Sequence, residues 1–192
     1  MAEHIVQTVY FEMAGPQNTD RVLELVASRA QALGIQHIVV ASTTGATGLK
    51  AVKALVGRNV TVVTHSTGFP GPNQQELTEE NRAAILAAGG RILTCQHALG
   101  GIGRAVRRKL GTYQIDEIVA FALRTFGQGT KVCCEITVMA ADAGYIPAGE
   151  EIIAIGGTGR GADTALVIRA ANAQDFFDLR VLEVLCKPRA WK

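Results

Sequence analysis

The sequence predicts an α/β fold with a largely parallel sheet, and three observations support this prediction. Short runs rich in Val, Ile and Thr alternate with segments of helical periodicity, as they do in βαβ units. Most of these runs end in a polar loop, as buried parallel strands do. With 192 residues, 48% of them hydrophobic, the chain has the size and composition of a single domain spanning residues 1–192.

Seven segments of the chain have strand character. Five of them are nearly continuous apolar, β-branched runs typical of buried strands, and two alternate as strands near a sheet edge do. The buried candidates are residues 37–42, 59–66, 91–96, 150–157 and 164–170, and the edge candidates are residues 5–12 and 180–187.

Helices are predicted between these strands. The first begins with the N-cap chemistry of residues 18–20 and ends at Leu33. Residues 131–144 are compatible with a strand or a helix, and we favour a helix because their apolar residues recur at helical spacing. Glu135 and Asp142 would share one face of it, where we expect them to be solvated or to cap neighbouring groups. The remaining predicted helices cover residues 46–56, 78–89 and 115–126.

Charge and composition exclude several classes of partner. A formal net charge of +2 predicts neither a nucleic-acid partner nor an anionic membrane, and no run approaches the ~18 apolar residues of a membrane span. The N-terminus lacks the pattern of a signal peptide, so we expect a cytoplasmic protein with reduced thiols. We expect no metal, because the cysteine spacing supplies no closed zinc site; the cysteines are Cys95, Cys133, Cys134 and Cys186.

Four loops rich in Gly, Ser, Thr and His follow predicted strands. The carboxyl ends of parallel strands open on one edge of the sheet, which is the usual ligand side of such folds, so these loops should meet there. Together they predict a site for a polar, phosphorylated small molecule. Their sequences are STTGATG (42–48), THSTGFPGPN (64–73), QHALGGIGR (96–104) and GGTGRGAD (156–163).

The first of these loops precedes a predicted helix and has two interpretations. A helix N-terminus leaves N–H groups unpaired and carries a partial positive charge, which suits an anion, and Gly45 would let the backbone approach it closely. Alternatively, Thr44 or Thr47 merely caps the helix. The neighbourhood of three similar loops favours the phosphate interpretation, although the G-K-[ST] signature of a Walker motif is absent.

Other polar residues of the four loops also have a ligand-binding and a structural interpretation. Arg160 suits a phosphate, whereas Asp163 is better explained as bracing its own loop. His65 and His97 are acid/base candidates, although a lone histidine is more often a structural hydrogen-bonding residue. A nucleophilic pair of Cys95 and His97 lacks an orienting third group, so we favour a buried, inert thiol.

Two further segments lie close to these loops in sequence. Residues 103–111 carry four cations and most simply form a solvated helix face, with Arg104 reaching the ligand phosphate as the alternative. Residues 67–77 form a long connection with two prolines, which suggests a lid. Within it, Phe69 is either a stacking surface for the ligand or an anchor to the core.

Six segments, in this order, resemble the C-terminal domain of pyruvate kinase, and more closely a family of stand-alone archaeal and bacterial proteins with that fold. They cover nearly the whole chain. The resemblance implies a three-layer α/β/α sandwich with a mixed, mostly parallel five-stranded core sheet, whose last core strand is antiparallel, and extra edge strands. The segments are YFEMAGPQNTDRVLELVASRAQALGI, HIVVASTTGATG, VTVVTHSTGF, CQHALGGIGRA, VCCEITVMAADAGYIP and IIAIGGTGRGADTALVIRAA.

The resemblance also implies roles for two loops. In pyruvate kinase, a Thr/Ser/Gly loop after the first strand holds a phosphate of a sugar bisphosphate activator, and a Gly-rich loop between the last two strands closes over it. Those roles fall here on residues 42–47 and 157–161. The catalytic barrel of pyruvate kinase is absent from this sequence, so we do not expect that activity. For the stand-alone family we expect flavin mononucleotide (FMN), which also presents one terminal phosphate.

Three hypotheses follow, with no substrate or reaction identified. The first is a protein that binds FMN or a similar phosphorylated ligand, with His97 or His65 as proton shuttle. The second is a non-catalytic module that senses a sugar phosphate, and the least supported is a hydrolase or transferase with His97 as base. A homo-oligomer is compatible with all three. The residues expected to hold the ligand are Ser42, Thr43, Thr44, Gly45, Ala46, Thr47, Thr67, Gly68, Phe69, His97, Arg104, Gly157, Thr158, Gly159, Arg160 and Gly161.

Overall fold

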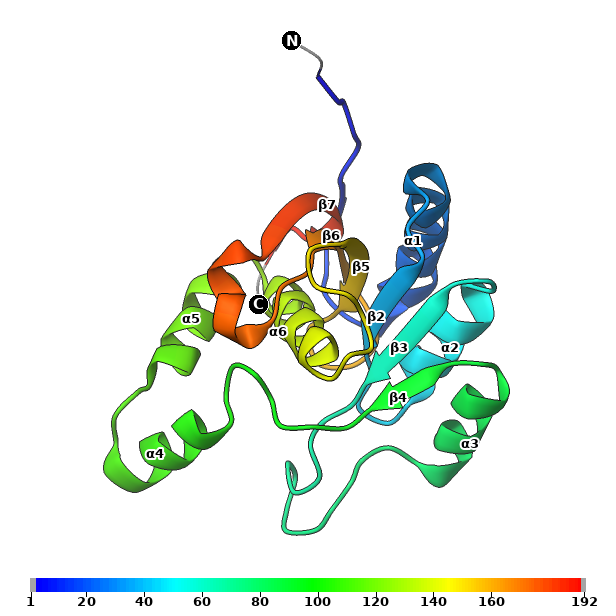
Figure 1. Ribbon diagram of the computed structural model, residues 1–192. Helices are drawn as coiled ribbons and strands as arrows, with labels where there is room; N and C mark the ends of the chain where they lie inside the picture. The colour runs from blue at the N-terminus through cyan, green and yellow to red at the C-terminus, as the bar shows by residue number, and fades with distance from the viewer. Residues whose placement is uncertain (1–2, 191–192) are drawn as a thin grey trace.

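Residues 3–190 are described by the computed structural model, in which a seven-stranded sheet lies between two layers of helices (Figure 1). Residues 1–2 and 191–192 of the predicted domain lie outside the described residues. The strand order is β1-β7-β6-β5-β2-β3-β4. The strands are β1 (Val9–Phe11), β2 (His37–Ala41), β3 (Asn59–Val63), β4 (Arg91–Leu93), β5 (Glu151–Gly156), β6 (Thr164–Arg169) and β7 (Arg180–Pro188).

The pairing of the strands confirms the mixed, mostly parallel sheet. Strands β5, β2, β3 and β4 are parallel, and β6 is antiparallel to β5, so these five form the predicted core sheet. Beyond β6 lie β7, antiparallel to it, and β1, parallel to β7 at the edge. Strands β3 and β4 end three residues before the predicted boundaries. There the chain turns out of the sheet, and the Thr64 and Thr94 hydroxyls hydrogen-bond to each other at 2.7 Å.

Two hydrophobic clusters, one on each face of the sheet, make up the core. Alternate residues of β2 serve both clusters, because successive side chains of a strand point to opposite faces. Ile38 and Val40 pack toward α1, α2 and α3, whereas Val39 packs toward α6. The three-layer arrangement is thereby confirmed. The helices are α1 (Thr19–Leu33), α2 (Ala46–Ala54), α3 (Glu79–Ala87), α4 (Ile102–Leu110), α5 (Ile115–Arg124) and α6 (Gln128–Asp142), with short 3₁₀ helices η1 (Pro16–Asn18) and η2 (Ala173–Asp178).

Residues 131–144, which the pattern left between strand and helix, fall largely in α6, so the helical interpretation is confirmed. Of the fifteen residues of α6, twelve are buried. Helix α6 lies directly on the sheet, and α5 packs on α6. The local sequence was ambiguous because a helix buried on nearly all sides has little polar face to reveal its period.

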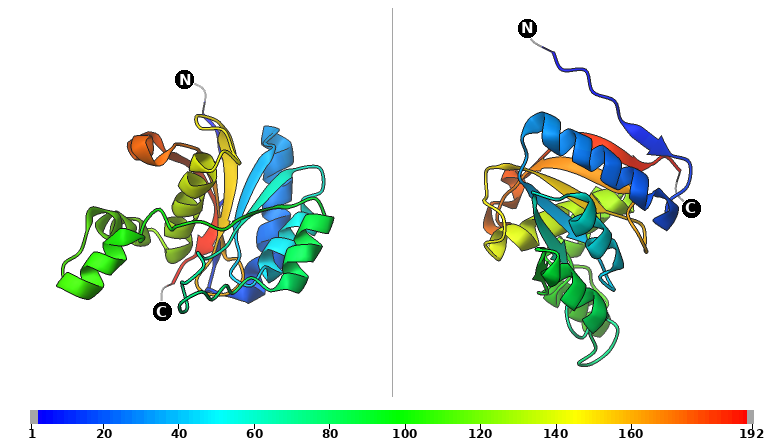
Figure 2. Two further views of the ribbon diagram at one scale, coloured as in Figure 1. Left: turned by 60° about the horizontal axis from the view of Figure 1, so that its bottom comes forward. Right: turned by 90° about the vertical axis from the view of Figure 1, so that its right-hand side faces the viewer.

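Helices α4 and α5 stand away from the body of the molecule on one side (Figure 2). None of the residues of α4 is buried, and α5 buries only Glu117 and Ala120. Within residues 3–190, no helix has both the length and the apolar character needed to cross a bilayer.

Candidate ligand-binding cleft

A cleft with a volume of about 750 Å³ opens where β2 and β3 end, at the edge of the sheet that the sequence predicted. All four predicted loops contribute residues to the lining of the cleft, but the loop of residues 96–104 contributes only His97. The predicted residues that line it are Ser42, Thr43, Thr44, Ala46, Thr47, His65, His97, Gly157, Gly159, Arg160 and Gly161.

The N-terminus of α2 faces this cleft with unpaired donors. The Ser42 hydroxyl accepts a hydrogen bond from the Gly48 N–H at 3.0 Å, and the first helical bond runs from the Leu49 N–H to the Gly45 carbonyl at 2.8 Å. Within the described part of the chain, the N–H groups of Ala46 and Thr47 have no acceptor. An anion placed there would accept from both donors and meet the positive end of the helix dipole.

Gly45 shapes the cradle without lining it. Its φ of 92° lies in the left-handed region, and a Cβ there would lie 2.6 Å from Asn81 Cβ and 2.7 Å from Leu77 Cδ1. The Asn81 side chain donates to the Thr44 carbonyl at 2.9 Å and so fixes the loop against α3. Glycine is therefore required at this position by both backbone conformation and close packing.

The loop of residues 157–161 covers the cleft beside η1. Its position is fixed by the buried Asp163 carboxylate, which accepts from the N–H groups of Gly15 at 3.1 Å and Thr158 at 3.0 Å. This confirms that Asp163 braces its own loop. At Gly161, where φ is 73°, a Cβ would lie 2.3 Å from Pro16 Cα, so the loop packs directly on the backbone that precedes α1.

Two cations line the mouth of the cleft. Lys50 lies one turn into α2 and pairs with Asp20 at 2.8 Å, and Arg160 lies on the glycine-rich loop. Sequence reasoning singled out Arg160 but missed Lys50. The spacing would have found it, because Lys50 follows the unpaired N–H groups by three or four residues and lies on the same face of the helix.

The floor of the cleft is apolar. It is formed by side chains from the ends of β2 and β3 and from α6. These residues are Ala41, Val63, Val132, Ile136 and Met139. A polar rim above an apolar floor is the usual composition of a small-molecule site.

His65 and His97 face each other across one end of the cleft, with ring centroids 5.4 Å apart. His65 Nδ1 lies 2.6 Å from a carboxylate oxygen of Glu76, a partner that sequence reasoning missed because it lies eleven residues away in a loop. His97 Nε2 accepts from the Ser66 N–H at 3.4 Å, and its Nδ1 lies 3.9 Å from Glu135 Oε1. Burial lowers the pKa of His97, with the Glu135 carboxylate acting in the opposite direction.

Beneath His97 lies a buried ion pair between Lys131 and Glu135, one turn apart on α6. Glu135 also accepts from the Leu99 N–H at 3.0 Å, which fixes the loop that carries His97. Of the two expectations for Glu135, the capping of a neighbouring group is therefore observed. Solvation is not observed, because only 5% of the Glu135 side chain is exposed. Burial lowers the pKa of Lys131, and Glu135 opposes that shift. Sequence reasoning overlooked Lys131, because an i,i+4 Lys–Glu pair on a helix is usually solvated.

The remaining predicted residues do not line the cleft itself. Gly45 and Thr158 lie in the two loops without lining the cleft, and Thr67 and Gly68 lie in the connection that leads to Phe69. Phe69 stacks on His97 with centroids 5.0 Å apart and an interplanar angle of 12°, at the border of the cleft. The Arg104 guanidinium lies 4.9 Å above the Phe69 ring.

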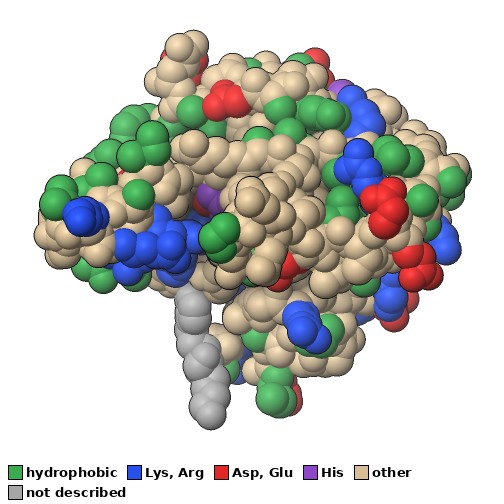
Figure 3. All heavy atoms as spheres, turned by 90° about the horizontal axis from the view of Figure 1, so that it is seen from below, with side chains coloured by type: hydrophobic (Ala, Val, Ile, Leu, Met, Phe, Trp, Pro, Cys, Tyr) green, Lys and Arg blue, Asp and Glu red, His purple; other side chains and the backbone are tan. Residues whose placement is uncertain are grey.

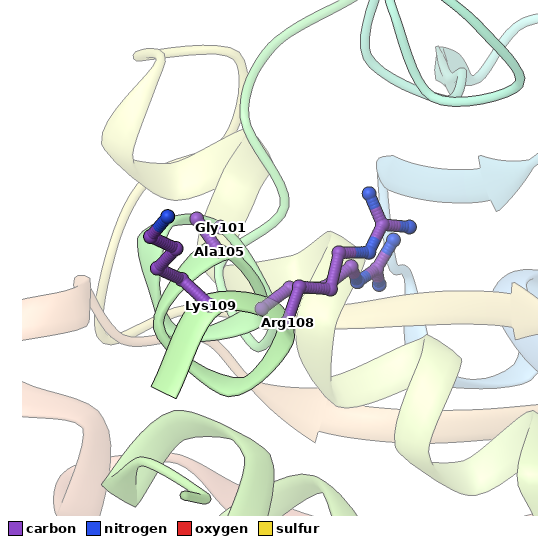
Figure 4. Close-up of a pocket in the computed structure, with 5 residues that line it drawn as sticks. Gly101, Ala105, Arg108 and Lys109 are labelled. Carbon is purple, nitrogen blue, oxygen red and sulfur yellow. The ribbon is translucent and has the colours of Figure 1, made fainter. Parts of the chain in front are cut away.

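Arg104 also contributes to a second, shallower hollow of about 400 Å³ on α4, lined by Gly101, Arg104, Ala105, Arg108 and Lys109 (Figure 4). From below, Lys and Arg side chains are seen gathered beside the depression in which a histidine is visible (Figure 3). The predicted solvated face of residues 103–111 is therefore basic and adjoins the cleft.

The cysteines offer no nucleophile to the cleft. Burial raises the pKa of Cys95, and a nearby Asp142 carboxylate adds to the effect. Burial also raises the pKa of Cys134 and Cys186 to about 12 and that of Cys133 in the same direction. Among residues 3–190, no group of three or more His, Cys, Asp or Glu side chains is placed to hold a metal ion.

Comparison with known proteins agrees with the family resemblance. The model of the family described as pyruvate kinase, alpha/beta domain, matches residues 20–168. Among solved structures, a pyruvate kinase from Cryptosporidium parvum is 14% identical, with 80% of this chain and 23% of that chain covered and a TM-score of 0.42. The same organism's pyruvate kinase in complex with ADP is 14% identical, with 80% and 24% covered and a TM-score of 0.43. The chain thus spans about a quarter of the length of these structures.

Proposed function

The chain belongs to the family of the pyruvate kinase alpha/beta domain, and from that premise we propose that it binds a phosphorylated small molecule in the cleft, with the phosphate on residues 42–47. One observation carries the proposal. The N–H groups of Ala46 and Thr47 open into the cleft without an acceptor in the described structure, at the positive end of α2.

The surrounding charges support an anionic ligand. Lys50 and Arg160 line the mouth of the cleft, and Arg104, Arg108 and Lys109 lie on the adjoining face of α4. A cleft bordered by charges of one sign concentrates ligands of the opposite sign and speeds their association. Lys50 is held only by an exposed pair with Asp20, which contributes little stability, so it can exchange this partner for a phosphate.

We propose FMN as the first ligand to test, since the cleft fits it on two counts. The cradle takes one terminal phosphate, and the floor of Val132, Ile136 and Met139 offers apolar surface to a flat ring system. A volume of about 750 Å³ is sufficient for a ligand of this size. Bound FMN would supply reversible electron transfer.

The residues of the chain would then have separable tasks. Residues 42–47 bind the phosphate, the apolar floor excludes water, and Phe69 at the border offers a stacking face. The lowered pKa of His97 favours its neutral form, and because Nε2 accepts from the Ser66 N–H, a proton on Nδ1 would face Glu135. His65, oriented by Glu76, is the second group that could hold or move a proton in the cleft.

Absorbance of the purified protein near flavin wavelengths, followed by titration with FMN, tests this proposal. Thr47→Asp is the informative variant, because a carboxylate in the first turn of α2 favours the helix yet repels a phosphate at the cradle. We expect FMN affinity to fall at least tenfold. Gln114→Asp places the same charge at the start of α5, outside the cleft, and should leave affinity unchanged. A protein that neither carries nor binds FMN contradicts the flavin assignment.

A second candidate is a module that senses a sugar bisphosphate without chemistry, and the two cations favour it. Lys50 on α2 and Arg160 on the opposite loop could each hold one phosphate of such a ligand. Thermal-shift measurements with FMN, fructose 1,6-bisphosphate and ribose 5-phosphate separate the two candidates. A ligand at a hundredfold excess over its Kd stabilises the folded state by ~2.7 kcal/mol. The compound closest in chemistry to the natural ligand should therefore give the largest rise in melting temperature.

A further inference from the structure

The two helices α4 and α5 carry a large apolar surface that no other part of the described chain covers. Six side chains are at least half exposed, five on these helices and Phe126 just after α5, from 53% at Ile118 and Phe121 to 74% at Ile115. We call these the arm surface, and its residues are Ile102, Leu110, Ile115, Ile118, Phe121 and Phe126. Tyr113 packs edge-on against Phe121, with centroids 5.6 Å apart, and links the two helices of the arm.

Helix α4 makes few contacts with the rest of the described chain, and these contacts do not bury any of its residues. It has nine residues and buries none of them. Isolated helices shorter than about 12–15 residues are marginal in water, and most helices in proteins are held by packing of an apolar face. Ile102, Val106 and Leu110 form such a face at i, i+4 and i+8, with Arg108 and Lys109 beside it. A partner that covers this face would supply the missing stabilisation.

A second exposed patch lies on the same side of the molecule, at η2 and the start of β7 (Figure 2). Phe177 is 82% exposed there, and Val181 and Leu182 are about 40% exposed. The patch is acidic where the arm is basic, since it carries Asp175 and Asp178. Arg180 lies 4.0 Å from Asp178 and offsets part of that charge. We call these residues the η2 patch.

The arm surface and the η2 patch together have the extent of a stable interface. A half-exposed large apolar side chain offers on the order of 100 Å², so the nine side chains offer roughly 900 Å², against the ~800 Å² per partner of a standard interface.

We propose that these two surfaces join two copies of this chain in a two-fold symmetric dimer, in which the arm of each copy covers the η2 patch of the other. A two-fold axis brings the same two surfaces together twice, so one chain supplies both halves of the complementary pair. The basic side chains of the arm, Arg108 and Lys109, have no ion pair within residues 3–190. In Figure 4 the labelled Arg108 and Lys109 side chains extend from α4 in different directions.

Sedimentation velocity over a range of protein concentrations tests the dimer. The wild-type chain should sediment as a dimer, and Ile118→Asp combined with Phe121→Asp should give a monomer with an unchanged circular dichroism spectrum. Leu86→Asp is the matched control, because Leu86 is 50% exposed on α3 in the opposite helical layer and should leave the dimer intact. A wild-type monomer at all concentrations, or a dimer that persists in the arm variant, overturns the proposal.

Charge reversal tests the pairing of the two surfaces. Arg108→Glu with Lys109→Glu, and separately Asp175→Lys with Asp178→Lys, should each raise the dimer Kd at least fivefold at low salt. All four changes in one chain should restore the Kd to within about threefold of wild type, and failure to restore it overturns the pairing. A membrane surface is the alternative partner for the arm, and flotation with vesicles containing one-fifth phosphatidylserine tests it. If the wild-type chain is monomeric and binds these vesicles, the dimer proposal is overturned.

Discussion

Helices α6 and α4 show how differently one chain can use a helix. In α6, twelve of fifteen residues are buried, and even its Lys131 and Glu135 are enclosed and paired. In α4, none of the nine residues is buried, and the ion pair that ties it to α5 joins the partly exposed Arg107 guanidinium to the buried Glu117 carboxylate of α5. The folding free energy must therefore reside in the body around α6, which leaves the arm available for other contacts.

The same contrast applies to the ligand site. The floor of the cleft is supplied by α6, a helix fixed on the sheet, whereas α4 contributes only cations beside the mouth. Substitutions that affect the body should change stability, and those in the arm should change association.

Breaking the buried pair of α6 should have the largest effect. Glu135→Ala leaves the Lys131 ammonium buried without a partner and removes the acceptor of the Leu99 N–H, so we expect a loss of about 3–5 kcal/mol in unfolding free energy. Urea denaturation measures it. Lys131→Met with Glu135→Leu removes both charges and should recover most of that loss. In the arm, Arg108→Ala should cost much less, because Arg108 is exposed and makes no ion pair within residues 3–190; equal losses would contradict the division.

Truncation of apolar side chains compares the two helices directly. Ile136→Ala in α6 should cost about 2–5 kcal/mol, because the side chain is only 4% exposed and its removal leaves a cavity. Leu110→Ala in α4 should cost less than about 0.5 kcal/mol in dilute protein, because Leu110 is 70% exposed. Denaturation of both variants at submicromolar concentration checks the difference. A large loss for Leu110→Ala at that concentration would mean that the arm is part of the cooperative fold.

How far the sequence could predict these features depends on how local their causes are. The strands and the cradle of residues 42–47 are encoded in consecutive residues, as β-branched runs followed by Gly, Ser and Thr, and so could be predicted. The early ends of β3 and β4 could not, since Thr64 leaves the sheet to meet Thr94, thirty residues away. The burial of Lys131 was missed for a similar reason, because a Lys–Glu pair one turn apart is usually solvated and only the packing of α6 encloses it.

Removing the cap of α2 should have a smaller effect. The Ser42 hydroxyl accepts from the Gly48 N–H, so Ser42→Ala should lower the unfolding free energy by about 1 kcal/mol. Thr44→Ala in the same loop is the control, because the Thr44 side chain makes no hydrogen bond within the described residues and is exposed. Urea denaturation of the two variants should therefore separate them. Equal stabilities of the two variants would show that the N-terminus of α2 does not depend on this hydrogen bond. It would then resemble the N-terminus of α4, which has no side-chain cap.

The smallest expected effect is a pH dependence that belongs to the body alone. Burial lowers the pKa of His97 below its ordinary value of 6.5, so the folded state binds fewer protons than the unfolded state between the two pKa values. The resulting destabilisation is absent above pH 7 and grows as pH falls through 6.5.

Wild-type stability should therefore decline more steeply between pH 7 and pH 5 than that of His97→Gln, which lacks the titrating ring. Arg108→Gln in the arm should keep the wild-type slope, because arginine stays charged throughout this range. Urea denaturation at half-unit pH intervals measures the three slopes. Parallel profiles for wild type and His97→Gln would mean that the His97 ring is as hydrated in the folded protein as in the unfolded chain, and the cleft would then be open to water beneath Phe69.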